Sequence, residues 1–201
     1  MIVVIGGANA ALTAADVANA DLTGRTVFLS QLETPAPVVE ALFAGRAARK
    51  GVKILNAAPA VEAGRALFPL VDIVVINQGE LVHYAGAAEP ATPADAILIA
   101  RRLISRPDQT IIVTLGAAGA LAVTPGGHGL AEGWPADVVD TTGAGDCFCG
   151  VLAAALSEGC SLTDALGWAN VAAAISTERA GAAVSSTLRP EAEARFSAGR
   201  G

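Results

Sequence analysis

The sequence predicts an α/β protein in which a doubly wound, mostly parallel sheet lies between two layers of helices. Short runs rich in β-branched residues alternate with longer Ala-rich runs as far as Leu115. The short runs are almost continuously apolar, which is typical of strands buried on both faces. The chain is 53% hydrophobic but only 4% aromatic, a composition that suits close packing of helices on a sheet. Such alternation indicates parallel strands joined by right-handed helical crossovers.

The individual elements follow from this alternation. The apolar runs predict strands over residues 2–5, 27–32, 52–55, 73–76 and 111–115. The runs between them predict helices over residues 13–19, 37–50, 78–85 and 93–104. The pairs Thr34-Pro35 and Thr92-Pro93 precede two of these helices and favour a helix start.

After Leu115 the pattern changes. Residues 120–123 predict a strand that returns through the turn Pro125-Gly126-Gly127 as an antiparallel hairpin. Two helices are expected over residues 143–157 and 162–179, with Ser161 as the N-cap of the second. Neither an internal repeat nor a linker interrupts the 201 residues, so we expect a single domain over residues 1–201.

Charge and composition exclude several classes of partner. The net charge is −6 and basic runs are no longer than a pair such as Arg101-Arg102, which argues against nucleic acid or an anionic membrane. No charge-free stretch is long enough to span a bilayer and no secretory signal is visible, so a cytoplasmic protein is expected. Cys147, Cys149 and Cys160 are expected to be core thiols, because their number is odd and the two histidines are isolated. The expected partner is therefore a small molecule.

Two common nucleotide-binding signatures are absent. The opening segment from Val3 to Ala8 is similar to the start of a dinucleotide-binding fold, but Ala8 and Ala11 stand where GxGxxG requires glycines. No GxxxxGK sequence occurs, which excludes a P-loop. A site of another kind is expected at the carboxyl ends of the strands, where ligands collect in such sheets. The polar residues found there are Gln31, Glu33, Asn56, Asn77, Glu80, Thr114 and Gly116, although strand ends also carry polar residues without any functional role.

The most informative segment runs from Asp140 to Asp146, with the sequence Asp-Thr-Thr-Gly-Ala-Gly-Asp. A turn of small residues that opens a helix leaves unpaired backbone N–H groups at the positive end of the helix dipole, where a phosphate can bind. A carboxylate at this position, Asp146, is unfavourable unless it takes part in chemistry, so we interpret it as a proton acceptor beside a transferring phosphoryl group. The alternative is that Asp146 is an ordinary helix cap.

This segment resembles the C-terminal signature of the ribokinase-like, or phosphofructokinase-B, family of carbohydrate and nucleoside kinases. Other family motifs are matched in order along the chain, by residues 7–12, Gln31-Leu32-Glu33, residues 56–60, Asn77-Gln78-Gly79-Glu80 and Thr114-Leu115-Gly116. Residues 7–12 and 31–33 point to the ribokinase branch. The resemblance implies a kinase that transfers the γ-phosphate of ATP to O5 of D-ribose.

The resemblance also implies roles for individual residues. Asp146 would be the base and part of the sugar site, and the backbone N–H groups of Gly143, Ala144 and Gly145 would form the anion hole. Glu33 would contact the ribose hydroxyls, with a solvated strand-end glutamate as the alternative.

Nucleotide and ion sites are implied in the same way. Asn77, Thr114, Gly116, Gly145 and Asn170 would bind ATP, although Asn170 could equally face solvent. Asn77 and Glu80 would organise Mg²⁺ through its waters. A K⁺ ion would be held on one side by Asp140 and Thr142 and on the other, mostly through backbone carbonyls, by Ser176, Arg179, Gly181 and Ser185; Ala183 and Val184 depart from the family pattern.

The resemblance begins partway into the family pattern. The family's lid and its Gly-Gly-Lys-Gly-x-Asn sugar motif have no counterpart in this sequence. We therefore expect an N-terminally truncated ribokinase-like fold without a lid, an exposed sheet edge able to pair with a second copy or a partner chain, and weak or absent ribose phosphorylation. The alternative function is a catalytically impaired nucleotide-binding remnant, or one piece of a split kinase, with a structural or regulatory role.

Overall fold

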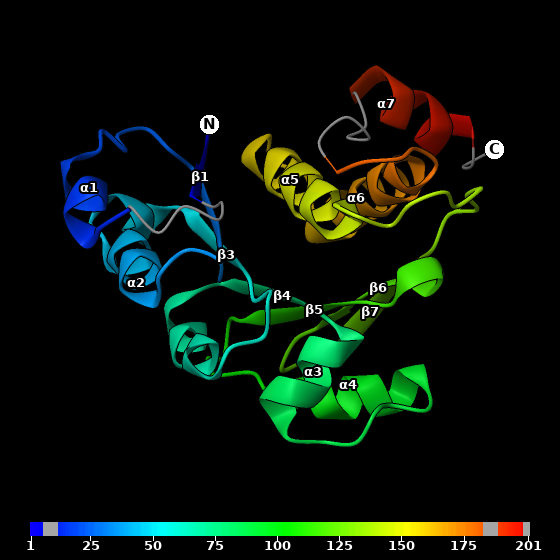
Figure 1. Ribbon diagram of the computed structural model, residues 1–201, viewed down its shortest axis with the longest axis horizontal. Helices are drawn as coiled ribbons and strands as arrows, with labels where there is room; N and C mark the ends of the chain where they lie inside the picture. The colour runs from blue at the N-terminus through cyan, green and yellow to red at the C-terminus, as the bar shows by residue number, and fades with distance from the viewer. Residues whose placement is uncertain (6–11, 183–188, 199–201) are drawn as a thin grey trace. The chain divides into compact units, whose positions relative to one another are not determined.

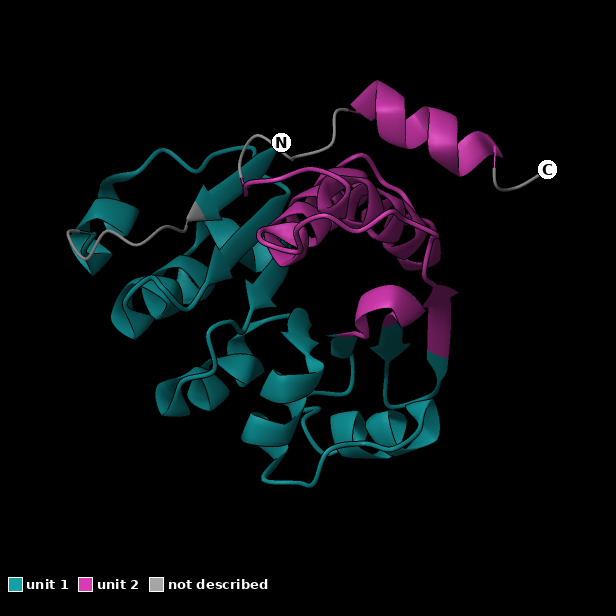
Figure 2. Ribbon diagram, turned by 45° about the vertical axis from the view of Figure 1, so that its right-hand side comes forward, with its two compact units in different colours: residues 1–113, 121–128 teal, residues 114–120, 129–201 magenta. Residues whose placement is uncertain are grey.

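The computed structural model describes residues 1–5, 12–182 and 189–198. These residues form two compact units: unit 1 comprises residues 1–113 and 121–128, and unit 2 comprises residues 114–120 and 129–201 (Figure 2). The single domain over residues 1–201 stays a prediction. No described helix has the length and apolar character needed to cross a membrane.

The strands form one sheet in the order β1-β2-β3-β4-β5-β6-β7 (Figure 1). Their bounds are β1 Ile2–Ile5, β2 Val27–Gln31, β3 Val52–Asn56, β4 Ile73–Asn77, β5 Thr110–Thr114, β6 Gly119–Val123 and β7 His128–Glu132. The pairs β1–β2, β2–β3 and β3–β4 are parallel, with Gln31 in register with Asn56. Only four residues separate β6 from β7, too few for a parallel crossover, so these two strands form the predicted antiparallel hairpin. The α/β class and the mostly parallel sheet are confirmed.

The helices occupy most of the predicted intervals. Their bounds are α1 Ala14–Asn19, α2 Ala36–Ala44, α3 Gln78–Ala85, α4 Pro93–Arg101, α5 Ala144–Ser157, α6 Leu162–Thr177 and α7 Arg189–Ala198, with short 3₁₀ helices η1 Ala47–Lys50, η2 Glu62–Leu70 and η3 Gly116–Ala118. In unit 1, α1 packs on α2 and α3 packs on α4. Side-chain caps at Thr13, Asn77, Thr92 and Ser161 fix where four of the helices begin.

Two expectations about unit 1 are wrong. The predicted helix over residues 37–50 ends at Ala44, because the chain leaves the helical conformation at Gly45 and resumes as η1. Strand β1 is not buried on both faces: it lies at the edge of the sheet, and Val4 is 64% exposed. The sequence predicts that an exposed apolar edge could pair with another chain, and that pairing stays a prediction.

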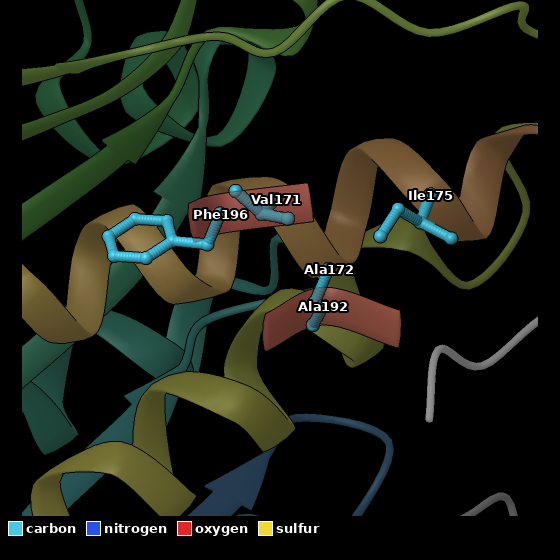
Figure 3. Close-up of a cluster of buried hydrophobic side chains, with 5 residues drawn as sticks. All are labelled: Val171, Ala172, Ile175, Ala192 and Phe196. Atoms are coloured by element: carbon cyan, nitrogen blue, oxygen red, sulfur yellow. The ribbon is translucent and has the colours of Figure 1, made fainter. Parts of the chain in front are cut away.

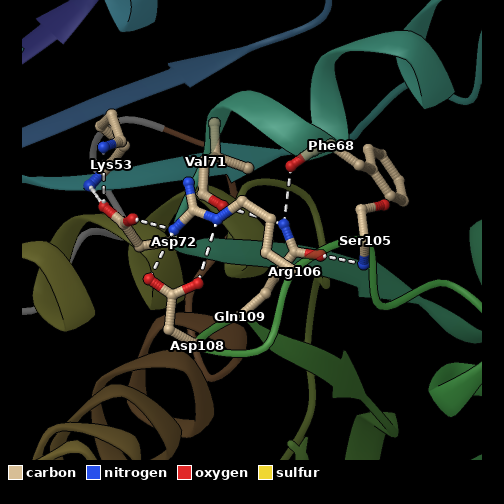
Figure 4. Close-up of polar contacts among 8 residues, drawn as sticks. All are labelled: Lys53, Phe68, Val71, Asp72, Ser105, Arg106, Asp108 and Gln109. Carbon is tan, nitrogen blue, oxygen red and sulfur yellow. Dashed lines mark hydrogen bonds and ion pairs between the residues drawn. The ribbon is translucent and has the colours of Figure 1, made fainter. Parts of the chain in front are cut away.

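A polar network holds the amino-terminal ends of three strands together (Figure 4). Asp72 accepts a hydrogen bond from the backbone N–H of Lys53 at 2.8 Å and pairs with Arg106 at 2.6 Å. The fully buried Gln109 donates to the carbonyl oxygens of Phe68 and Val71 at 2.6 and 2.8 Å. These bonds satisfy backbone groups that would otherwise be buried without partners, and they fix the starts of β3, β4 and β5.

One cluster of buried apolar side chains in unit 2 lies where α7 packs on α6 (Figure 3). Its buried members are Val171, Ala172 and Ile175 of α6 and Ala192 and Phe196 of α7. The Phe196 ring stacks on Trp168 with 4.4 Å between centroids. Of the three cysteines, Cys149 is buried, whereas Cys147 and Cys160 are half-buried. The prediction of core thiols therefore holds in full only for Cys149.

Candidate active site

The turn before α5 has the geometry of an anion-binding site. Gly143 is the N-cap residue with φ of 80°, in the left-handed region that favours glycine. The N–H of Ala144 donates to the carbonyl oxygen of Thr141 at 3.2 Å and so is used within the turn. Gly145 and Asp146 follow in the first helical turn, whose backbone N–H groups lack partners within a helix. The exposed Asp146 side chain therefore lies in the first turn of α5, at the positive end of the helix.

Asp140 holds this turn against the segment that follows α6. Its carboxylate accepts hydrogen bonds from the backbone N–H groups of Gly181 at 3.0 Å and Thr142 at 2.9 Å. These bonds, that of Gly181 first, lower the pKa of Asp140 from 3.8 to about 2. The backbone N–H of Asp140 donates to the carbonyl oxygen of Thr177 at 3.0 Å. The carboxylate thus joins two loops that are distant in sequence.

The residues predicted to hold K⁺ are only partly brought together. Asp140, Thr142 and Gly181 meet through the bonds just described. The hydroxyl of Ser176 is buried and donates to the carbonyl oxygen of Ala173 at 2.7 Å, and Arg179 pairs with Glu191 of α7. Ser185 lies outside the described residues. The K⁺ site therefore stays a prediction, and Asp140 is its best-positioned member.

The lowered pKa of Asp140 predicts a specific loss of stability in acid. Because the folded-state pKa is depressed, the ionised carboxylate stabilises the fold above its ordinary value of 3.8, and this contribution disappears as the pH falls towards about 2. In urea unfolding followed by tryptophan fluorescence, Asp140→Asn should therefore be less stable than the parent at about pH 6, and the difference should shrink below about pH 4. A difference that does not vary with pH would contradict this role of the carboxylate.

A pocket of about 550 Å³ lies within unit 2 beside this turn. Four of the five predicted ATP-binding residues, Thr114, Gly116, Gly145 and Asn170, line it together with Ala144 of the turn, whereas the fifth, Asn77, does not. They come from the end of β5, from η3, from the start of α5 and from the middle of α6. A volume of this size is typical of sites for small ligands.

Asn170 has a defined position in the pocket wall. Its side chain is only 7% exposed, and its amide nitrogen donates to the carbonyl oxygens of Ala131 and Glu132 at 2.8 and 3.3 Å. The alternative that Asn170 faces solvent is therefore wrong. The residue anchors the end of β7 to α6 and lines the pocket from there.

Sequence reasoning missed one wall of the pocket. Trp134, Pro135, Ala136 and Val138 line it, in an irregular segment for which no element was expected. Helix α7 supports this wall, because Phe196 contacts Trp134 with 6.0 Å between ring centroids and Arg195 donates to the carbonyl oxygen of Pro135. A largely apolar wall that contains an indole is suited to a flat aromatic ligand group. The only available signal was Trp134 itself, one of two tryptophans in the chain.

The remaining predicted residues belong to unit 1, at the carboxyl ends of its strands. Gln31 and Asn56 are paired in register, and Asn77 ends β4, which confirms that these polar side chains share one edge of the sheet. The side-chain amide of Gln31 donates to the carboxylate of Glu33 at 3.2 Å. The Glu33 carboxylate is exposed, and the hydrogen bond from Gln31 holds it at the end of the strand.

Asn77 and Glu80 form a reciprocal cap on α3. The side chain of Asn77 accepts from the N–H of Glu80 at 2.9 Å, and the Glu80 carboxylate accepts from the N–H of Asn77 at 2.8 Å. Glu80 is only 8% exposed, and this burial raises its pKa. The motif therefore has a structural function of its own. Among the described residues, no group of three His, Cys, Asp or Glu side chains is arranged to hold a metal ion.

Comparisons with known proteins find related chains. The model of the pfkB family of carbohydrate kinases matches residues 1–188. A ribokinase of Haemophilus influenzae is 36% identical over 193 residues, which cover 94% of this chain and 62% of that protein. The Arabidopsis thaliana ribokinase complexed with ribose and ATP has a TM-score of 0.80 and 25% identity, over 92% of this chain and 59% of that one.

A second solved ribokinase structure is similar over a comparable part of its chain. The ribokinase of Cryptococcus neoformans var. grubii, solved in complex with ADP, has a TM-score of 0.76 and 30% identity, over 88% of this chain and 63% of that one. The chain thus spans about 60% of the length of each of these relatives.

Proposed function

Because the chain belongs to the pfkB family of carbohydrate kinases, as its motifs predicted, we propose that it binds ATP in the unit 2 pocket and carries the base for phosphoryl transfer to a sugar. The observation that carries this proposal is the convergence of Thr114, Gly116, Gly145 and Asn170 on one pocket beside the start of α5. The sequence alone predicted that these four residues bind ATP, and they come from four separate segments of the chain.

The chemistry follows from the turn at the start of α5. Asp146 would accept the proton of the attacking sugar hydroxyl, whose oxygen forms a bond to the γ-phosphorus of ATP while the bond to the β–γ bridging oxygen breaks and ADP leaves. The amide N–H groups of Gly143 and Gly145 would stabilise the charge on the transferring group, as they point from the positive end of the helix. The apolar wall around Trp134 would contact the base of the nucleotide.

We propose D-ribose as the sugar and its O5 as the acceptor. The support is the similarity to a ribokinase of Haemophilus influenzae and to an Arabidopsis thaliana ribokinase complexed with ribose and ATP. Glu33 would accept hydrogen bonds from ribose hydroxyls, since its carboxylate is exposed at the carboxyl end of β2.

Ions complete the proposal. Mg²⁺ would neutralise phosphate charge, and because Asn77 and Glu80 are bonded to each other in the cap of α3, they would reach it through its waters. K⁺ would bind near the carboxylate of Asp140, whose depressed pKa keeps it ionised at neutral pH.

The proposal is tested by incubating the chain with [γ-³²P]ATP, Mg²⁺, K⁺ and ribose and measuring labelled sugar phosphate. We expect transfer of the labelled phosphate that requires ribose. Binding of ATP without any ribose-dependent transfer would instead favour a nucleotide-binding role or one piece of a split kinase. A chain that does not bind ATP would contradict both functions.

A further inference from the structure

A second pocket lies in unit 1, at the opposite edge of the sheet from Gln31 and Asn56. Its volume is about 780 Å³, and it is bounded by the end of α1, the loop that leads into β2, the end of α2, and η1, which leads into β3. The pocket therefore sits at the amino-terminal ends of β2 and β3. None of the residues assigned to the proposed kinase site lines it.

The lining of this pocket is strongly basic. Arg46, Arg49 and Lys50 line it, and Asp21 is its single acidic residue. The Asp21 carboxylate already accepts a hydrogen bond from the N–H of Thr23 at 3.0 Å. Arg25 follows the pocket residue Gly24, and its Nε atom is buried without a hydrogen-bond partner. Three cations and one acid thus line this pocket, in a chain whose net charge is −6.

These cations differ from the others in the described part of the chain. Most of the other lysine and arginine side chains bind a carboxylate, a hydroxyl or a carbonyl oxygen, namely Lys53, Arg65, Arg102, Arg106, Arg179, Arg189 and Arg195. Within the described ranges, the side chains of Arg25, Arg46, Arg49 and Lys50 make no hydrogen bond or ion pair, and the only other lysine or arginine side chain without one is that of Arg101. Like charges placed close together repel one another, and an anion between them would remove that cost.

We infer that this pocket binds a small phosphate-bearing molecule. Arginine presents a planar set of donors that matches phosphate oxygens, and lysine adds a point charge. The volume is that of a small-ligand site, and the acidic character of the rest of the chain disfavours an extended polyanion such as nucleic acid. The site goes beyond the proposed kinase function and does not depend on it.

The inference is tested by isothermal titration calorimetry of the whole chain with inorganic pyrophosphate. The test variant is the triple substitution Arg46→Gln, Arg49→Gln and Lys50→Gln, and the matched control is Arg101→Gln, which removes a comparable unpaired charge from α4. We expect the triple variant to bind pyrophosphate at least tenfold more weakly than the parent, and the control to bind it equally well. Equal affinity of the parent and the triple variant would overturn the inference.

Two further measurements keep the result unambiguous. The three substituted side chains make no described polar contact, so the triple variant should unfold at the same temperature as the parent. If the triple variant is less stable than the parent, Arg49→Gln alone should bind pyrophosphate with an affinity between those of the parent and the triple variant. The phosphate could belong to a phosphorylated sugar or be a free phosphate, and titration with ribose 5-phosphate distinguishes the two. If ribose 5-phosphate binds more tightly than pyrophosphate, the site is assigned to a phosphorylated sugar; if it binds more weakly, the site is assigned to free phosphates. If the triple variant loses pyrophosphate but still binds ATP, the two sites are independent, and failure of one proposal leaves the other standing.

Discussion

Asp146→Asn is expected to lower the rate of ribose phosphorylation about 10²- to 10⁴-fold, the range typical for removal of a general base. Asparagine has nearly the same shape as aspartate but cannot accept the proton of the attacking hydroxyl. The side chain is exposed at the start of α5 and makes no described hydrogen bond, so the substitution should not disturb the fold. The labelled-ATP transfer assay measures the effect directly.

The matched control for this substitution is Asp137→Asn. Asp137 is also exposed and also belongs to unit 2, and like Asp146 it does not line the pocket, but it lies outside the turn at the start of α5. We expect its transfer rate to stay within about twofold of the parent, because a surface charge outside the site contributes little. Transfer by the parent that survives Asp146→Asn would show that another group removes the proton.

Gly143→Ala is expected to destabilise unit 2 by about 1–3 kcal/mol and to weaken ATP binding. The residue has φ of 80°, and an added Cβ atom would lie 3.0 and 3.1 Å from Cα and Cβ of Ala182. The alanine variant would therefore have to shift either the turn or the neighbouring loop, and that shift would move the amide donors of the anion-binding turn. Both tryptophans lie in unit 2, so urea unfolding followed by tryptophan fluorescence reports on this unit.

Gly150→Ala is the control in the same helix. Gly150 is exposed in the middle of α5, and a Cβ atom there would meet nothing within 4 Å. Alanine should therefore stabilise the helix by up to about 1 kcal/mol without changing ATP binding. Equal effects of the two substitutions would show that the left-handed turn is not required.

Much of unit 1 could be predicted from the sequence because its signals are local. Strands β2 to β5 are almost continuously apolar, and a polar residue such as Asn77 marks where a strand ends, so their positions followed from pattern alone. The 3₁₀ helix from Glu62 to Leu70 was missed, because Gly64 and Pro69 within it are normally helix breakers. Helix α7 was missed because only Ala192 and Phe196 are buried in it, which is a weak periodic signal.

The candidate site likewise contains residues that could be predicted from the sequence and residues that could not. Gly143 and Asp146 could be predicted because their motif places chemical groups at fixed spacing, and Asn170 because of the family resemblance; the roles of all three stay predictions. The wall formed by Trp134 and Pro135 could not be predicted, since it depends on support from α7 across 60 residues of sequence. The mutual bonds of Asn77 and Glu80 were likewise visible only in the structure, and they assign that motif a capping role besides the proposed one.

The central claim, that ATP binds in the unit 2 pocket, is tested most directly by titrating ATP and Mg²⁺ into two single-tryptophan variants. Trp134 lines the pocket, whereas Trp168 stacks on Phe196 and does not line it. In Trp168→Phe, the emission of Trp134 should change and saturate as ATP is added. In Trp134→Phe, the emission of Trp168 should stay nearly constant. No saturable change in the first variant, or an equal change in both, would contradict the account.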